Sequence, residues 1–194
     1  FIYPFLLSEL DKSPEPFLPE NLPHARNFEQ MGQVFMRSGT GKDDTYCLFS
    51  CGGILAHHRH YDALNFVIYK KGFLALDSGT RYKEFDNGQH LANYYAQTVA
   101  HNCILIHQPE EPPARYWGGK VEGNHGGQHH QLGSIVKAFE TNDEYVYVAG
   151  DATECYKHGF IKREGKPDLP EKCALVTRQL VFLMPNHFVI FDRV

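Results

Sequence analysis

The sequence predicts an all-β protein built as an antiparallel two-sheet β-sandwich. Short runs rich in Val, Ile, Phe and Tyr recur along the 194 residues, and several of them are joined by turn sequences. Helical patterns of about 10 to 15 residues do not separate these runs, which disfavours a parallel α/β sheet. Strands joined by tight turns pair most economically as antiparallel hairpins, so a sandwich or jelly roll is expected.

Nine strands are expected, at residues 33–37, 46–50, 64–69, 73–77, 102–107, 134–140, 145–149, 177–184 and 188–194. Turn residues at 70–72, 141–143 and 185–187 predict hairpins at these three positions. Residues 90–100 place Leu91, Tyr94, Tyr95 and Thr98 at helical spacing, although so short a stretch is equally compatible with a loop.

The segment before the first strand has a different composition. It contains four prolines, each of which fixes φ and removes a backbone donor: Pro14, Pro16, Pro19 and Pro23. We therefore expect residues 1–28 to form an extended Pro-rich linker, a remnant of a preceding domain, and residues 29–194 to form one β domain. The chain begins with Phe1 rather than Met, and it ends within an apolar run. We expect this domain to be trimmed at both ends.

The composition excludes some classes of protein and favours others. Nineteen Lys and Arg against 23 Asp and Glu give a net charge of −4, so a nucleic-acid partner is not expected. The sequence contains no run of 18 apolar residues, so it predicts no membrane-spanning helix. The five cysteines form no CxxC pair and leave the redox compartment open. Twelve His and 11 Tyr are more than packing requires, and both residue types bind metals or transfer protons.

The densest candidate site is the sequence HHRHYD at residues 57–62. In an extended segment, residues two apart share a face, so His58 and His60 project together. Two neutral imidazoles in this arrangement can bind a divalent metal ion when one or two further ligands join them. The alternative is a pair of solvent-facing residues on an edge strand, and the motif alone does not decide between them.

Two further residues are candidates for the same site. Asp77 ends an apolar run before a Ser-Gly turn, where it could merely cap that turn, and His101 could be a histidine at the edge of the core. If Lys71 centres the hairpin, Asp77 lies opposite Asn65, and His60 lies five positions away, about 17 Å along an ideal strand. A site that unites these residues therefore requires the chain to turn back near residues 61–63.

Four blocks in this order resemble the C-terminal β-sheet domain of the heparinase II/III-like polysaccharide lyases: HHRHYDALNFVIYKKGFLALDSGTRY, NYYAQTVAHNCILI, GDATECY and TRQLVFLMPNHFVIFDRV. The likeness runs from about residue 33 to residue 194, and its most specific parts are HxHxD, LDSG and AHN. The resemblance implies a structural metal ion, usually zinc, held by His60, Asp77 and His101. It also implies that His58 points into the substrate cleft.

The activity implied by the resemblance is β-elimination on a polysaccharide that contains uronic acid, of the glycosaminoglycan or alginate type. Tyr94 or Tyr95 would join His58 in catalysis, and Arg59 would contact substrate. Trp117, the single tryptophan, could stack on a sugar ring or pack on the sheet. The partners implied are an acidic polysaccharide and an N-terminal α/α-toroid domain of the same parent protein, in the periplasm or outside the cell. Without that helical domain, we expect this chain to be inactive.

Two alternatives remain open at this point. A cupin-type jelly-roll metalloenzyme also combines HxH, a glycine-containing hairpin and a later histidine, but Leu64 and Asn65 stand where a cupin usually carries Glu. A non-catalytic carbohydrate-binding or structural β-module would bind no metal ion. The glycine-rich stretch 123–130, with His125, His129 and His130, is expected to be an exposed mobile loop without a role.

Overall fold

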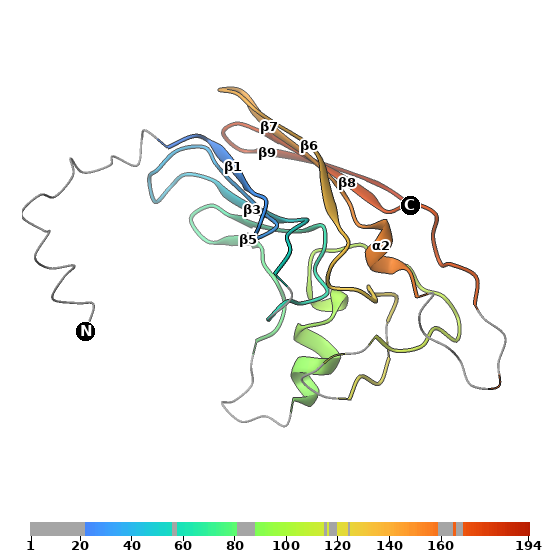
Figure 1. Cartoon of the computed structure of the whole chain (residues 1–194). Helices are drawn as coiled ribbons and strands as arrows, with labels where there is room; N and C mark the ends of the chain where they lie inside the picture. Colours follow the sequence, from blue (N-terminus) through green and yellow to red (C-terminus); the bar gives the residue numbers. More distant parts are fainter. Residues whose placement is uncertain are drawn as a thin grey trace, which may run out of the picture.

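Two antiparallel sheets pack face to face in the computed structural model, as the sequence predicts (Figure 1). The structure describes residues 22–55, 58–80, 88–114, 116, 120–123, 125–158, 165 and 169–194. One sheet has five strands in the order β1-β2-β3-β4-β5, and the other has four in the order β6-β7-β8-β9. Sequential order in both sheets means that each strand pairs with its neighbour in the chain.

The five-stranded sheet contains β1 (Ala25–Phe28), β2 (Gln33–Arg37), β3 (Tyr46–Ser50), β4 (Asn65–Tyr69) and β5 (Phe73–Ala75). Alternate residues of β2 and β3 are buried, and these side chains form one half of the core: Val34, Met36, Cys47 and Phe49. Strand β1 lies within the segment expected to be a linker, and it pairs with β2. The sheet therefore begins before residue 29.

The four-stranded sheet contains β6 (Ile135–Thr141), β7 (Tyr145–Asp151), β8 (Thr177–Leu183) and β9 (His187–Arg193). Its inward side chains supply the other half of the core: Val146, Val148, Leu180 and Phe182. The turns predicted at 70–72, 141–143 and 185–187 connect β4 to β5, β6 to β7 and β8 to β9. Turn chemistry and alternation therefore gave the correct pairing at all three hairpins.

The strand expected at residues 102–107 is wrong. This stretch pairs with no strand among the described residues, and its carbonyl and amide groups bond to loops and side chains instead. Tyr156 Oη donates to the Ile104 carbonyl (2.5 Å), and the Ile106 amide donates to the Gly126 carbonyl (2.8 Å). An apolar run whose backbone groups bond to loops and side chains has the same sequence pattern as a buried strand.

Short helical turns and long connections gather at one end of the sandwich (Figure 1). Residues 90–100, where helix and loop stayed open, form a π-helical turn, η3 (Leu91–Tyr95), and a 3₁₀ turn, η4 (Thr98–Ala100). A short helix, α2 (Thr153–Tyr156), follows β7. In the part of the chain that the structure describes, no helix has the length and apolarity to cross a membrane.

Candidate functional site

The chain reverses direction between the HxH motif and β4, as a combined site requires. The Asn65 amide donates to the Asp62 carbonyl (3.0 Å), and the Leu64 amide donates to the Ser50 carbonyl (2.7 Å). Leu64 has a φ of +68°, in the left-handed region that an L-residue adopts only where its surroundings hold it there. The reversal takes His60 off the line of β4, so the strand distance of about 17 Å no longer applies.

His60, Asp77 and His101 meet at this end of the sandwich. His101 Nδ1 lies 3.1 Å from Asp77 Oδ2, and the ring centroids of His60 and His101 are 5.3 Å apart. A backbone bond from the Ser78 amide to the Ala100 carbonyl (2.7 Å) joins the two segments that carry Asp77 and His101. Three side chains separated by up to 41 positions in the sequence therefore form one cluster.

Two asparagines hold the carboxylate in place. Asn65 is buried, and its Nδ2 donates to Asp77 Oδ1 (2.8 Å) while its Oδ1 accepts from the Asn102 amide (2.9 Å). Asn102 Nδ2 in turn donates to the Phe66 carbonyl (2.9 Å). Sequence reasoning placed Asn65 opposite Asp77 through the hairpin ruler but assigned it no role, and it missed the role of Asn102.

The charge states follow from these contacts. Burial lowers the pKa of His60, and the neighbouring His101 lowers it further. Burial by itself would raise the pKa of Asp77, but its contact with His101 and the hydrogen bond from Asn65 outweigh burial and hold that pKa below its ordinary value. At neutral pH the cluster therefore presents a neutral His60 imidazole beside a carboxylate.

The donor set suits a borderline-soft divalent cation, although the side chains are not yet in ligand positions. The Nε2 atom of His101 has no hydrogen-bond partner among the described residues, and Nδ1 faces only Asp77, although the side chain is only 2% exposed. A buried nitrogen without a partner is costly, and a cation would satisfy it. Over the described residues, however, no three His, Cys, Asp or Glu groups are close enough to hold a metal ion as they stand.

A polar hollow of about 170 Å³ opens beside the cluster, and His58, Arg59, His60 and Asp62 contribute to its lining. His58 is exposed and has a φ of +58°, a strained conformation that is found disproportionately at functional sites. Arg59 is fixed by hydrogen bonds from its guanidinium group to the carbonyls of Gly52 and Leu55. The structure thus brings two predicted substrate-facing residues to the same hollow as His60.

The two tyrosines occupy different positions. The Tyr95 ring contacts the His60 ring edge-on, with centroids 5.9 Å apart. The Tyr94 hydroxyl lies 2.6 Å from Ser78 Oγ, in the turn that follows Asp77. Both side chains project from the π-helical turn η3, a distortion that is frequent at functional sites. Tyr95 is therefore the tyrosine nearer to the histidine cluster, a choice the sequence left open.

Some expectations fall elsewhere. Trp117 lies outside the described residues. The stretch 123–130 is not uniformly exposed as expected: His125 is exposed, but Gln128 and His129 are buried. No pattern in this stretch signals the burial, since glycines, histidines and glutamine together are typical of a loop.

His129 belongs to a buried charged group, which predicts a pH dependence of stability. Its Nε2 lies 2.7 Å from Glu111 Oε1, and Lys172 forms an ion pair with the same oxygen. Burial, together with the nearby Lys172 and His158, lowers the pKa of His129 below 6.5 against the opposing effect of Glu111. The unfolded chain therefore binds more protons just below pH 6.5, so the free energy of unfolding falls as the pH drops through this window.

Glu111 extends the loss to lower pH. Burial would raise its pKa, but hydrogen bonds from His129 and Lys172 hold it below 4.5, so its contribution is complete above pH 4.5 and is lost further down. Urea unfolding of the wild type at pH 7.5 and pH 5.5 should show lower stability at pH 5.5. The drop should be smaller in His129→Gln, and an equal drop in both proteins would contradict the assignment.

Comparison with known proteins identifies the family. The sequence profile of the heparinase II/III-like C-terminal domain matches residues 20–164. A search of curated proteins gave no match. Among solved structures, heparan sulfate lyase HepC from Pedobacter heparinus has a TM-score of 0.61 at 16% identity, covering 98% of this chain and 25% of its own. A heparinase III described as the BT4657 gene product has a TM-score of 0.60 at 18% identity, covering 96% and 24%.

These structural similarities, at such low identity, establish the fold, and the chain spans about a quarter of the length of the structures that it matches. The profile match covers most of the chain and favours none of the alternatives, the cupin among them. The blocks HxHxD, LDSG and AHN, which carry the resemblance in the sequence, lie within the matched residues and supply the cluster described above. The chain therefore belongs to the heparinase II/III-like family, as its C-terminal β-sandwich domain.

Proposed function

We propose that this chain is the sandwich half of a polysaccharide lyase that cleaves uronate-containing polysaccharide by β-elimination. The observation that carries the proposal is the polar hollow, because His58 and Arg59 line it together with His60, and Tyr95 contacts His60. The relatives whose structures match are named as heparinase III and as a heparan sulfate lyase, which favours a glycosaminoglycan over alginate as the substrate.

The reaction requires a base, an acid and a means to offset negative charge. A base removes the proton from C5, the C4–O4 bond breaks as the C4=C5 double bond forms, and O4 leaves with the electron pair and takes a proton from an acid. The carboxylate beside C5 opposes this step, because its charge repels the developing carbanion. Imidazole and phenol groups suit the two proton transfers, so we assign them to His58 and Tyr95.

Arg59 has a separate role in the proposal. Its guanidinium is always charged, and it is anchored at the wall of the hollow by two backbone carbonyls. A uronate carboxylate bound in the hollow would be attracted to this cation, which would hold the sugar and offset its charge.

The proposal includes a structural zinc ion. His60, Asp77 and His101 would hold it, and the family resemblance, the donor chemistry and the unpartnered Nε2 of buried His101 support this choice. When bound, the ion supplies a rigid link between three segments of the chain. His58 lies two residues from His60, so this link would fix the backbone that carries His58.

The remaining catalytic groups are proposed to come from a helical toroid domain that precedes this sandwich in a longer protein. We propose that this protein acts in the periplasm or outside the cell. The test is the ultraviolet absorbance of unsaturated uronate, measured with heparan sulfate and with alginate. Turnover is expected from the longer protein and not from these 194 residues alone. Failure of the longer protein on every uronate polysaccharide would contradict the lyase proposal, and rapid turnover by the short chain would contradict the need for the helical domain.

A further inference from the structure

Gln128 is a completely buried amide that bonds to both backbone groups of another segment. Its side chain is 0% exposed. Its Oε1 accepts a hydrogen bond from the Ala63 amide (3.1 Å), and its Nε2 donates to the Ala63 carbonyl (2.9 Å) and to Tyr156 Oη (3.3 Å). The side chain thus pairs with Ala63 as a neighbouring strand would, at a place where the chain has left the sheet.

The backbone of the same residue holds a second segment. The Gln128 amide donates to Thr98 Oγ1 (2.8 Å) at the start of η4. Ala63 lies three residues after His60, and Thr98 lies three residues before His101. Gln128 therefore adds a side-chain and a backbone link between the segments that carry the two histidines, beside the direct bond from the Tyr61 amide to the Ala96 carbonyl (2.9 Å). The imidazole centroids lie 5.3 Å apart.

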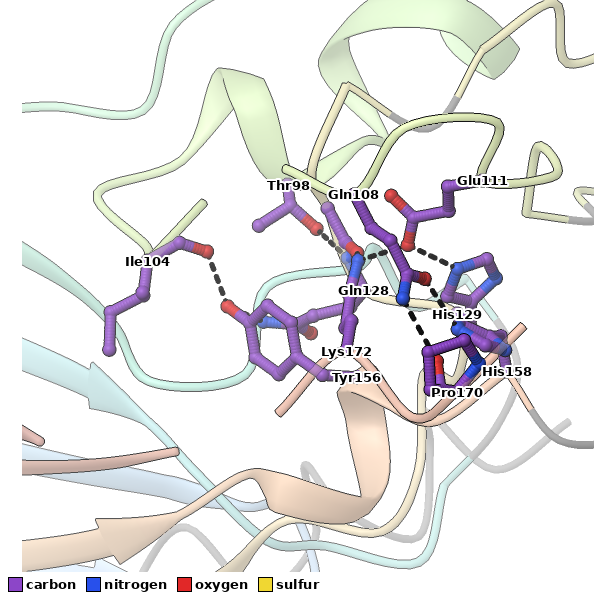
Figure 2. A network of polar contacts seen from close by, with 11 residues as sticks. Thr98, Ile104, Gln108, Glu111, Gln128, His129, Tyr156, His158, Pro170 and Lys172 are labelled. Carbon is purple, nitrogen blue, oxygen red and sulfur yellow. Dashed lines mark hydrogen bonds and ion pairs between the residues drawn. The ribbon is translucent and has the colours of Figure 1, made fainter. Parts of the chain in front are cut away.

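A buried charged network fixes Gln128 from the other side (Figure 2). Lys172 Nζ donates to the Gly127 carbonyl (2.6 Å) and forms an ion pair with Glu111. Glu111 also contacts His129, whose backbone amide donates to the Cys155 carbonyl (2.7 Å). The residues on both sides of Gln128 are thus anchored to other segments. Buried charges are expensive to desolvate, so such a network is weak evidence for stability and better evidence for fixed geometry.

We propose that Gln128 is a positioning residue that sets the separation between His60 and His101. The bonds to Ala63 and Thr98 carry this inference, and no ion is needed for it. Its consequence for metal affinity and catalysis rests on the proposed function. Groups that orient metal ligands without touching the metal typically change affinity by about 10- to 100-fold when they are removed.

The test compares Gln128→Met with Gln108→Met in the 194-residue chain. Gln108 is the control, because it is an amide of the same size in the same network, half-buried where Gln128 is fully buried. It bonds to the Pro170 carbonyl (2.9 Å) and to His158 (2.7 Å), rather than to the segments that carry the histidines. Two quantities are measured: nuclear Overhauser contacts between the rings of His60 and His101 without metal, and zinc affinity by competition with a chelating dye.

Gln128→Met should weaken the ring contacts and lower zinc affinity by about 10- to 100-fold, while Gln108→Met keeps both near the wild type. Unchanged ring contacts in Gln128→Met, or equal loss in both variants, would overturn the proposal. If the wild type binds no zinc, the metal site of the proposed function fails, and the ring contacts still decide the role of Gln128. Should Gln128→Met not fold, Gln128→Asn, an amide too short to span both groups of Ala63, gives the same comparison.

Discussion

Replacing Arg178 by methionine is expected to lower the free energy of unfolding by about 3 kcal/mol, because a buried cation loses four hydrogen bonds, two of them to backbone carbonyls. Arg178 lies on β8 and is 5% exposed. Its guanidinium binds Asp192 on β9 through two hydrogen bonds of 2.7 and 2.8 Å. It also crosses to the site end of the molecule, where it donates to the carbonyls of Leu64 and Asn102.

The reason for the large effect is that one side chain satisfies several groups at once. Methionine fills most of the volume but leaves the carbonyls of Leu64 and Asn102 without this donor, a loss of about 1–3 kcal/mol for each carbonyl that is buried. Asp192 also loses its cation, at a smaller cost because its side chain is 34% exposed. Urea unfolding measures the change. Arg193→Met is the control, since Arg193 is exposed on β9 and should change stability by no more than about 0.5 kcal/mol. A loss below about 1 kcal/mol for Arg178→Met would contradict this role.

Replacing His58 by alanine in the longer protein is expected to lower kcat by about 10²- to 10⁴-fold, the usual contribution of a positioned acid or base. KM should change little, because the proposal gives substrate binding to Arg59. Zinc content should stay at the wild-type level, since His58 is not among the proposed ligands. The measurement combines initial rates of unsaturated uronate formation with metal analysis of the purified variant.

His125→Ala is the matched control for His58→Ala. Both histidines are exposed, and both have positive φ, +58° for His58 and +55° for His125. Alanine at either position therefore meets the same backbone strain, and only His58 lines the polar hollow. A similar fall in kcat in both variants would trace the effect to the backbone, and unchanged kcat in His58→Ala would remove His58 from the mechanism.

The strands could be predicted wherever a side chain either faces the core or marks a turn. Alternation in β2 and β7 and the turn at Lys71 are local signals, and they gave the correct elements. The strand predicted at residues 102–107 is wrong. The side chains of Ile104 and Ile106 pack against the core, but their backbone groups bond to a side chain and a loop rather than to a strand. Whether a buried run pairs with a strand or a loop is decided by partners distant in the sequence, so composition does not reveal it.

For the site, the sequence predicted a requirement rather than a geometry. In the predicted hairpin, regular pairing places His60 far from Asp77, so a site that contains both requires the chain to reverse near Asp62. The left-handed backbone conformation of Leu64 makes this reversal. Arg178 and Gln128 could not be recognised, because each acts by bonding to backbone carbonyls or amides of other segments. Backbone groups are the same in every residue, so such contacts leave no pattern in the sequence.

The zinc stoichiometry of the purified chain tests the central claim most directly. The account predicts one tightly bound zinc ion per wild-type chain, lost on His101→Ala and retained on His187→Ala, which removes an exposed histidine of β9. Loss of the ion should also lower the Tm, because it releases the link between three segments. Absence of zinc from the wild type, or equal zinc in wild type and His101→Ala, would contradict it.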